Sequence, residues 1–280
     1  MVSLEIDRLR AEEVVTRLDT AFRNKMGVFA DTKELLENQI PQKVTPLSIE
    51  HACFLFYLIS NDYGTKSSML YERAKRLYVS DPALFSPRLI LQRFTDYEDV
   101  DLVESTGVRL GTRFPAETAK RWYLNSEKLC REYEGDPRAI FSSNDARVVF
   151  SRIREFRGFG PKIGGLLLRT FIGCGFAHLE NLEDVLIPVD IHDARIAFWT
   201  GAVNIPDMAG EIEDYHRYAS QVQHVWSQAC RAKELDWLEV DRALWILGSK
   251  GCVKLLCGTC ALNNICRIGI VQESSKLIKA

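Results

Sequence analysis

Apolar residues recur at helical spacing along most of the chain. Val14, Leu18 and Phe22 stand four residues apart in a charged segment, which predicts one buried helical face. Few segments alternate apolar and polar residues with a period of two, so a large sheet is not expected. The pattern therefore predicts an all-α fold. Further helices are predicted at 47–59, 67–78, 116–133, 161–171, 190–199, 211–230 and 235–247, with one more after Asn144-Asp145.

Three of these helices carry recognisable start signals. Thr45-Pro46 reads as an N-cap followed by Pro at the first helical position, which would open the apolar helix at 47–59. Asn144-Asp145 is a second capping pair, and Pro161 suits the first turn of the helix at 161–171.

Composition and charge narrow the class of protein. The chain has 280 residues, with 36 Lys and Arg against 38 Asp and Glu, a net charge of −2. This balance excludes a uniformly basic nucleic-acid binder and still allows a local basic face. The longest apolar run, 52–59, is far shorter than the ~20 residues that span a bilayer. Because residues 1–20 are rich in charge, no signal peptide is expected. We therefore expect a cytoplasmic, nucleoid-associated protein, or a nuclear one in a eukaryote, without a membrane partner.

The eight cysteines are unevenly distributed. Four are scattered, whereas Cys252, Cys257, Cys260 and Cys266 are clustered near the C-terminal end. Neighbouring thiolates repel one another and gain from a shared cation, so the cluster predicts a metal site. Zinc sites more often pair two distant Cys-x2-Cys knuckles, and only one such knuckle occurs here, so the spacing is atypical of a zinc site.

The segment 156–164 reads Phe-Arg-Gly-Phe-Gly-Pro-Lys-Ile-Gly between two predicted helices. Its glycines allow a tight turn and a close approach of the backbone to a ligand. The N–H groups at the following helix start form an anion site that suits a DNA phosphate. Around this turn, residues 147–172 hold six Arg and Lys against Glu155. The alternative is an ordinary interhelical turn with a solvated charged face.

The combination of motifs resembles the helix-hairpin-helix DNA glycosylase superfamily, and within it the endonuclease III branch. That branch has a hairpin of the form Leu-Pro-Gly-Val-Gly-x-Lys, followed by Val-Asp-Thr-His and by Cys-x6-Cys-x2-Cys-x5-Cys around a 4Fe–4S cluster. Here residues 156–162 match the hairpin and 189–192 read Val-Asp-Ile-His. The last two cysteine intervals match, and the first is two residues shorter. Arg157, Ile191 and Asp193 stand where Pro, Thr and an apolar residue are usual.

This resemblance implies a DNA repair enzyme that excises a damaged or modified base. It implies that Lys162 is the attacking amine, that Asp190 is the assisting carboxylate, and that strand cleavage accompanies base removal. Lys162 could instead contact a phosphate or be a solvated lysine, and Asp190 could simply cap a helix. The implied DNA contacts are Gly158, Gly160, Gly164 and His192, of which His192 could equally be structural. The implied 4Fe–4S ligands are Cys252, Cys257, Cys260 and Cys266.

The resemblance also implies two helical lobes. Residues 47–173 would form a helical barrel that ends with the hairpin, and 174–280 a second lobe carrying Asp190 and the metal loop. Residues 1–46 would pack on the second lobe. We expect a monomer that binds double-stranded DNA in the cleft. Two other functions remain open, a monofunctional glycosylase for a specialised base and a non-catalytic, metal-stabilised DNA-binding module.

Two further segments are candidates for DNA contact. The stretch 60–66 lies where the family places its wedge loop, with Tyr63 or Asn61 as the inserting residue. It could equally be an ordinary interhelical loop. The basic stretch 109–131 includes Arg113, Lys120 and Arg121 as phosphate neighbours, and a solvated charged helix is the alternative.

Overall fold

The computed structural model describes residues 4–205 and 217–271. It is 66% helix and 2% strand, which confirms the all-α prediction. The helices predicted at 67–78, 116–133, 161–171, 190–199 and 235–247 are all present, with ends displaced by no more than three residues. Residues 211–216 of the predicted helix at 211–230 lie outside the described residues. The α-helix found there runs from Ala219 to Ala232, with Tyr218 as its N-cap. Among the residues described, no helix is long and apolar enough to cross a membrane.

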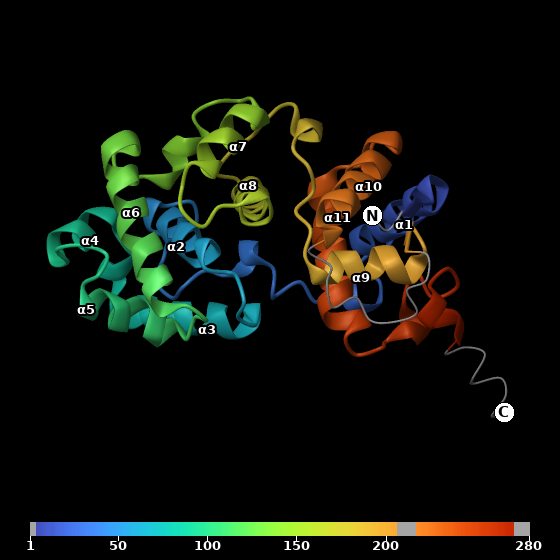
Figure 1. The fold of residues 1–280 in the computed structure, drawn as a ribbon, viewed down its shortest axis with the longest axis horizontal. Coiled ribbons are helices and arrows are strands. Elements are labelled where there is room, and N and C mark those ends of the chain that lie inside the picture. The colour runs from blue at the N-terminus through green and yellow to red at the C-terminus, as the bar shows by residue number, and fades with distance from the viewer. Residues whose placement is uncertain (1–3, 206–216, 272–280) are drawn as a thin grey trace. The chain divides into compact units, whose positions relative to one another are not determined.

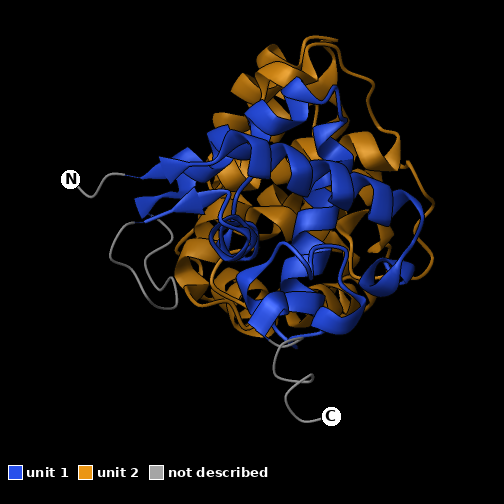
Figure 2. Ribbon diagram, turned by 90° about the vertical axis from the view of Figure 1, so that its right-hand side faces the viewer, with its two compact units in different colours: residues 1–32, 186–280 blue, residues 33–185 orange. Residues whose placement is uncertain are grey.

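The chain folds into two compact units, coloured separately in Figure 2. Unit 1 comprises 1–32 and 186–280, and unit 2 comprises 33–185. The boundaries predicted from the sequence are 46/47 and 173/174. Residues 174–185 join unit 2 because they pair with the start of the helix at 146–154: Ala146 N donates to Glu180 O at 3.0 Å, and Glu180 N to Asn144 O at 2.7 Å.

Unit 1 is built on the N-terminal helix α1 (Arg8–Arg23). Its face at Val14, Val15 and Leu18 is fully buried and packs against α10 (Ala219–Ala232) and α11 (Trp237–Ile246). Val14 and Leu18 confirm the predicted apolar stripe on this helix, whereas its third member, Phe22, is half-buried. The other elements of unit 1 are β1 (Glu5–Ile6), 3-10 helices at Gly27–Ala30 and Cys257–Thr259, α9 (Ile191–Thr200), β2 (Val203–Asn204), which is antiparallel to β1, and a π-helical turn at Leu247–Cys252.

Unit 2 is built around the apolar helix α2 (Ile49–Ser60; Figure 1). This helix is buried from His51 to its end. A helix that is apolar on every side must be covered on every side, and α3, α8 and short 3-10 segments do this. The elements are α3 (Ser67–Ser80), α4 (Pro87–Arg93), α5 (Val100–Val103), α6 (Pro115–Tyr133), α7 (Ala146–Arg154), α8 (Pro161–Cys174), a π-helical turn at Glu104–Val108, and 3-10 helices at Leu36–Asn38, Pro82–Phe85, Pro137–Phe141 and Leu182–Asp184.

The predicted start of α2 is wrong, whereas those of α7 and α8 are confirmed. Ser48, not Thr45, is the N-cap of α2, and its hydroxyl accepts from His51 N at 3.2 Å. Leu47 has a φ of 64°, so the chain turns between Pro46 and the helix and cannot be helical there. Asp145 caps α7 and Pro161 opens α8, as predicted.

Candidate functional site

Three glycines shape the turn between α7 and α8, each for a different reason. Gly158 has a φ of 90°, and a Cβ there would lie 2.9 Å from the carbonyl oxygen of Ser60. A Cβ on Gly164 would lie 3.3 Å from Ile153 Cγ2, so Gly164 allows α7 and α8 to approach closely. Gly160 differs, because a Cβ there would meet no atom within 4 Å. Of the three, Gly160 faces open space, where the backbone of a ligand could approach.

Aromatic packing and an amide fix this turn on the core of unit 2. The buried rings of Phe156 and Phe159 lie 5.2 and 5.0 Å from the ring of Phe56, centroid to centroid. The side chain of Asn125 on α6 bonds both backbone groups of Arg157, accepting from its N at 2.9 Å and donating to its O at 3.0 Å. The turn is therefore held from two sides, which gives α8 a defined starting direction.

Lys162 is the second residue of α8 and is half-buried. The N-cap, Gly160, has no side chain that could cap the helix, and Pro161 has no backbone N–H. The positive end of the α8 dipole and the lysine thus lie in the same helical turn. This combination suits an anion such as a phosphate.

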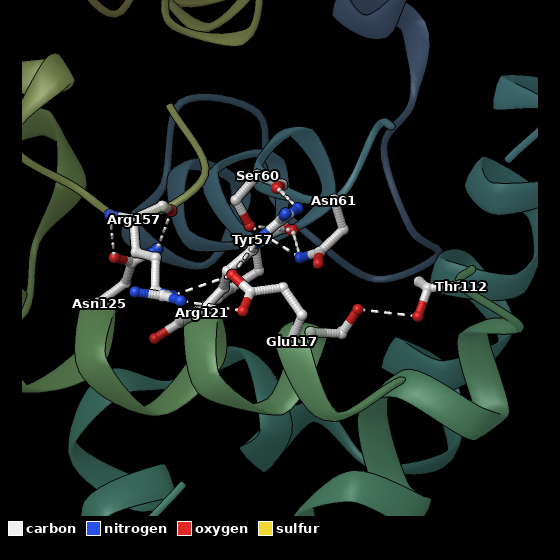
Figure 3. A network of polar contacts seen from close by, with 9 residues as sticks. Tyr57, Ser60, Asn61, Thr112, Glu117, Arg121, Asn125 and Arg157 are labelled. Carbon is white, nitrogen blue, oxygen red and sulfur yellow. Dashed lines mark hydrogen bonds and ion pairs between the residues drawn. The ribbon is translucent and has the colours of Figure 1, made fainter. Parts of the chain in front are cut away.

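A polar network joins the turn to α2 and α6 (Figure 3). The Glu117 carboxylate accepts hydrogen bonds from Nε and Nη2 of Arg157 at 2.9 and 3.0 Å, and from Nε of Arg121 at 3.3 Å. The hydrogen bonds from Arg157 are the main cause of the lowered pKa of Glu117. Arg121 also donates to Ser60 O at 2.8 Å. Arg121, expected as a phosphate neighbour, therefore holds α2 and α6 together.

The charge excess of 147–172 is smaller at the surface than its sequence suggests. Arg147 pairs with Asp145 at 2.7 Å and with Asp184 at 3.7 Å. The Arg169 side chain is 3% exposed and lies 3.5 Å from Glu37, too deeply buried to contact a phosphate. With Arg157 paired as well, Lys162 belongs to a smaller basic group than the sequence count indicates.

The loop after α2 distinguishes the two wedge candidates. Asn61 is 2% exposed and donates to Tyr57 O at 3.0 Å, so it closes the helix end and is not placed to insert into DNA. Tyr63 is 49% exposed. Between them, Asp62 is buried and accepts from Tyr71 Oη at 2.8 Å, which fixes the loop. Tyr63 remains the candidate.

Asp190 caps α9 and is 8% exposed. Its Oδ1 accepts from His192 N at 2.6 Å and from Asp193 N at 3.3 Å. In return, Asp193 Oδ2 accepts from Asp190 N at 2.7 Å, which completes a capping box. The predicted cap is thus confirmed. The carboxyl of Asp193 is a feature that sequence reasoning missed, and its only signal was a polar residue where the family has an apolar one.

The first turn of α9 packs tightly on the turn that ends at Cys252. A Cβ on Gly248 would lie 2.6 Å from His192 Cβ. Arg195 donates to Gly248 O at 3.3 Å, and its Nη1 lies 3.2 Å from His192 Nδ1. His192 therefore has a structural partner. The 247–252 turn, whose last residue is Cys252, supports the helix that Asp190 caps.

The four clustered cysteines lie close enough to affect one another's charge. Burial, followed by the charges of Cys260 and Cys266, raises the pKa of the Cys252 thiol to about 12. Leu262 N donates to Cys260 Sγ at 3.4 Å, the kind of bond that supports a ligating sulfur. By residue type the four thiols fit a 4Fe–4S cluster or a zinc ion. Within 4–205 and 217–271, no three His, Cys, Asp or Glu side chains gather into a group that could hold a metal ion.

The N-terminal part of unit 1 supports the segment that carries the clustered cysteines, residues 252–266, which we call the cysteine loop. Arg17 on α1 donates to Asn264 Oδ1 at 2.7 Å. A Cβ on Gly27 would lie 2.9 Å from Thr259 O, so the segment after α1 lies directly against the loop. The cysteine loop is therefore held by residues from the opposite end of the chain.

The candidate site residues divide between the two units. Lys162 and the three glycines belong to unit 2, whereas Asp190, His192 and the cysteines belong to unit 1. No protein-family model matches the sequence, and no curated protein matches it.

Proposed function

We propose that the protein is a DNA N-glycosylase with AP-lyase activity that removes a damaged or modified base from double-stranded DNA. The observation that carries the proposal is the start of α8. There a glycine that faces open space directly precedes the uncapped helix start that carries Lys162. A DNA backbone could approach Gly160 and place a sugar near the lysine amine.

In this proposal Lys162 is the nucleophile. Its neutral amine forms a bond to C1′ of the sugar, and the electron pair of the broken N-glycosidic bond leaves with the base. Loss of a proton from nitrogen and opening of the sugar ring give a Schiff base. Removal of a C2′ proton then expels the 3′ phosphate and cuts the strand. Base release and strand cleavage therefore share one intermediate.

Asp190 would assist as an ionised carboxylate. Breaking the glycosidic bond builds positive charge on the sugar, and a fixed carboxylate stabilises that charge. Asp190 is buried and held by two backbone N–H groups, so its orientation costs little reorganisation during the reaction.

The proposal assigns support roles to the remaining residues. Gly158 and Gly164 would shape the hairpin, and His192 would orient the start of α9. Cys252, Cys257, Cys260 and Cys266 would hold a 4Fe–4S cluster, with zinc as the alternative. When bound, the metal would supply a structural cross-link for the loop that packs against α9.

Borohydride trapping tests the proposal directly. Duplexes that carry oxidised, alkylated, deaminated or hypermodified bases are incubated with the protein and reduced, and base release is measured in parallel. A covalent complex is expected on at least one lesion and should be lost in Lys162→Ala. Lys75→Ala is the control, because Lys75 is a half-buried lysine of unit 2, as Lys162 is, and pairs with Glu72.

The same experiment separates the other functions. Base release that persists in Lys162→Ala would identify a monofunctional glycosylase. If no lesion yields base release and duplex DNA binds with a steep salt dependence, the protein is a DNA-binding module and the proposal is wrong.

A further inference from the structure

Asp193 places a second buried carboxyl beside Asp190. The Asp193 side chain is 3% exposed, and its Oδ2 lies 2.7 Å from Asp190 N. Asp190 Oδ1 accepts a hydrogen bond from Asp193 N at 3.3 Å, so each side chain binds the backbone of the other residue. The position of the Asp190 carboxyl therefore depends on Asp193 as well as on the helix.

The groups packed around Asp193 are mainly acidic or uncharged. The carboxylates of Asp190, the N-cap of α9, and of Asp241 on α11 both disfavour a negative charge on Asp193. On α10, the Trp226 indole donates a hydrogen bond to the backbone oxygen of Asp193 at 3.4 Å. On α9 itself, Arg195 Nη1 lies 3.2 Å from His192 Nδ1. The elements packed against α9 carry further charged groups. Asp19 pairs with Arg23 on α1, Glu239 pairs with Arg242 on α11, Lys250 pairs with Asp31 beside the 247–252 turn, and α10 carries His224 and Arg231.

Two buried carboxylates this close disfavour a second negative charge. Burial, followed by the charges of Asp190 and Asp241, raises the pKa of Asp193 well above its usual range. The other oxygen of Asp193, Oδ1, is buried and has no hydrogen-bond partner among the described residues. A neutral carboxyl tolerates such surroundings better than an ionised one does.

We propose that Asp193 is a positioning residue whose buried carboxyl binds the Asp190 amide and leaves Asp190 as the ionised carboxylate at the start of α9. This inference rests on the proposed glycosylase function of Asp190. Ionisation of Asp193 at alkaline pH would set two carboxylates against each other and disturb the capping box. The activity should therefore fall on the alkaline side as Asp193 loses its proton.

Three variants test the inference. Asp193→Val removes the acceptor for Asp190 N and should lower the rate of base release about tenfold without changing DNA affinity. Asp193→Asn keeps an uncharged acceptor, so it should restore most of this loss at neutral pH and flatten the alkaline decline. Asp241→Asn removes one negative charge, which should move the alkaline decline to lower pH.

A readout that does not depend on activity separates this inference from the proposed function. Above the unfolded pKa of about 4, the unfolded chain loses the Asp193 proton while the folded chain keeps it, until Asp193 ionises in the folded chain as well. Native stability therefore falls as pH rises through this range. Asp193→Asn lacks this loss, and its urea midpoint should rise relative to the unchanged protein over that range.

Each outcome has a definite meaning. If the midpoint difference stays constant with pH, or if Asn is no better than Val, the role of Asp193 is refuted while Asp190 can still be catalytic. If the stability signature appears and no lesion is processed, the glycosylase proposal fails, and the catalytic role of Asp193 fails with it.

Discussion

Glu117 accepts two parallel hydrogen bonds from the guanidinium of Arg157, with Nε–Oε1 at 2.9 Å and Nη2–Oε2 at 3.0 Å. Arg157 occupies the place where the resembling family has proline, directly before Gly158. A proline ring would restrict the backbone at this position, whereas the Arg157–Glu117 pair restrains the turn by joining it to α6. It also neutralises a guanidinium that would otherwise add positive charge to the hairpin.

Glu117→Gln should weaken this link. The folded pKa of Glu117 is lowered, so its ionised form stabilises the protein above the unfolded pKa of about 4.3, and this contribution is lost as pH falls. We expect a loss of about 1 kcal/mol at neutral pH that disappears in acid. Urea unfolding at several pH values measures it, and a loss independent of pH would contradict the assignment.

The same substitution should strengthen non-specific binding to duplex DNA, because it leaves Arg157 and Arg121 without their carboxylate. The salt dependence of binding should steepen, since more counterions are released. Glu12→Gln, which makes the same charge change in unit 1 beside Lys233, is the control. Equal gains in both variants would mean that the hairpin does not face DNA.

Asn125→Ala should loosen the hairpin turn. It leaves both part-buried backbone groups of Arg157 without their side-chain partner, at a cost of about 1–2 kcal/mol. Thr118→Ala is the matched control on α6, because it removes a buried hydroxyl that bonds Thr112. Hydrogen exchange at 157–159 should accelerate only in Asn125→Ala. Equal exchange in both variants would argue against a local role for Asn125.

Gly158→Ala and Gly160→Ala should separate folding from binding. Ala at 158 meets a left-handed backbone and the Ser60 carbonyl, so we expect a loss of about 2–4 kcal/mol. Ala at 160 fits the backbone and the open space, so its effect should stay within about 1 kcal/mol. If DNA approaches Gly160, that variant should nevertheless bind duplex DNA more weakly. Unchanged DNA affinity in Gly160→Ala would place the DNA elsewhere.

Cys260→Ser should remove the metal. Protein purified without oxygen is expected to carry about four irons per chain, and this variant should lose most of them. Cys230→Ser is the control, since Cys230 is a buried thiol of unit 1 outside the cluster. Stoichiometric zinc without iron in the unchanged protein would overturn the iron–sulfur assignment.

Local signals in the sequence predicted much of the candidate site. The start of α8 at Pro161, the cap at Asp190 and the glycines around the turn depend on neighbours in the chain, so their conformations could be inferred from adjacent residue types. The start of α2 could not, because Leu47 adopts a left-handed conformation that no nearby residue demands.

Contacts between distant residues could not be predicted in this way. Glu117 and Asn125 are ordinary polar positions of a charged helix until the turn at 157 packs against them. Asp193 looks like a solvated residue until α10 and α11 cover it. The pKa values and hydrogen bonds of such side chains depend on desolvation and on partners from other elements.

The sequence by itself determined the all-α class, most helix positions and the residue types available for chemistry, because helical periodicity and caps act over a few residues. Only the tertiary structure decided which charges are neutralised, which glycine faces open space, and that Asp190 shares its cap with a second buried carboxyl. These properties arise from burial and from contacts between segments far apart in the chain, and local residue patterns do not encode them.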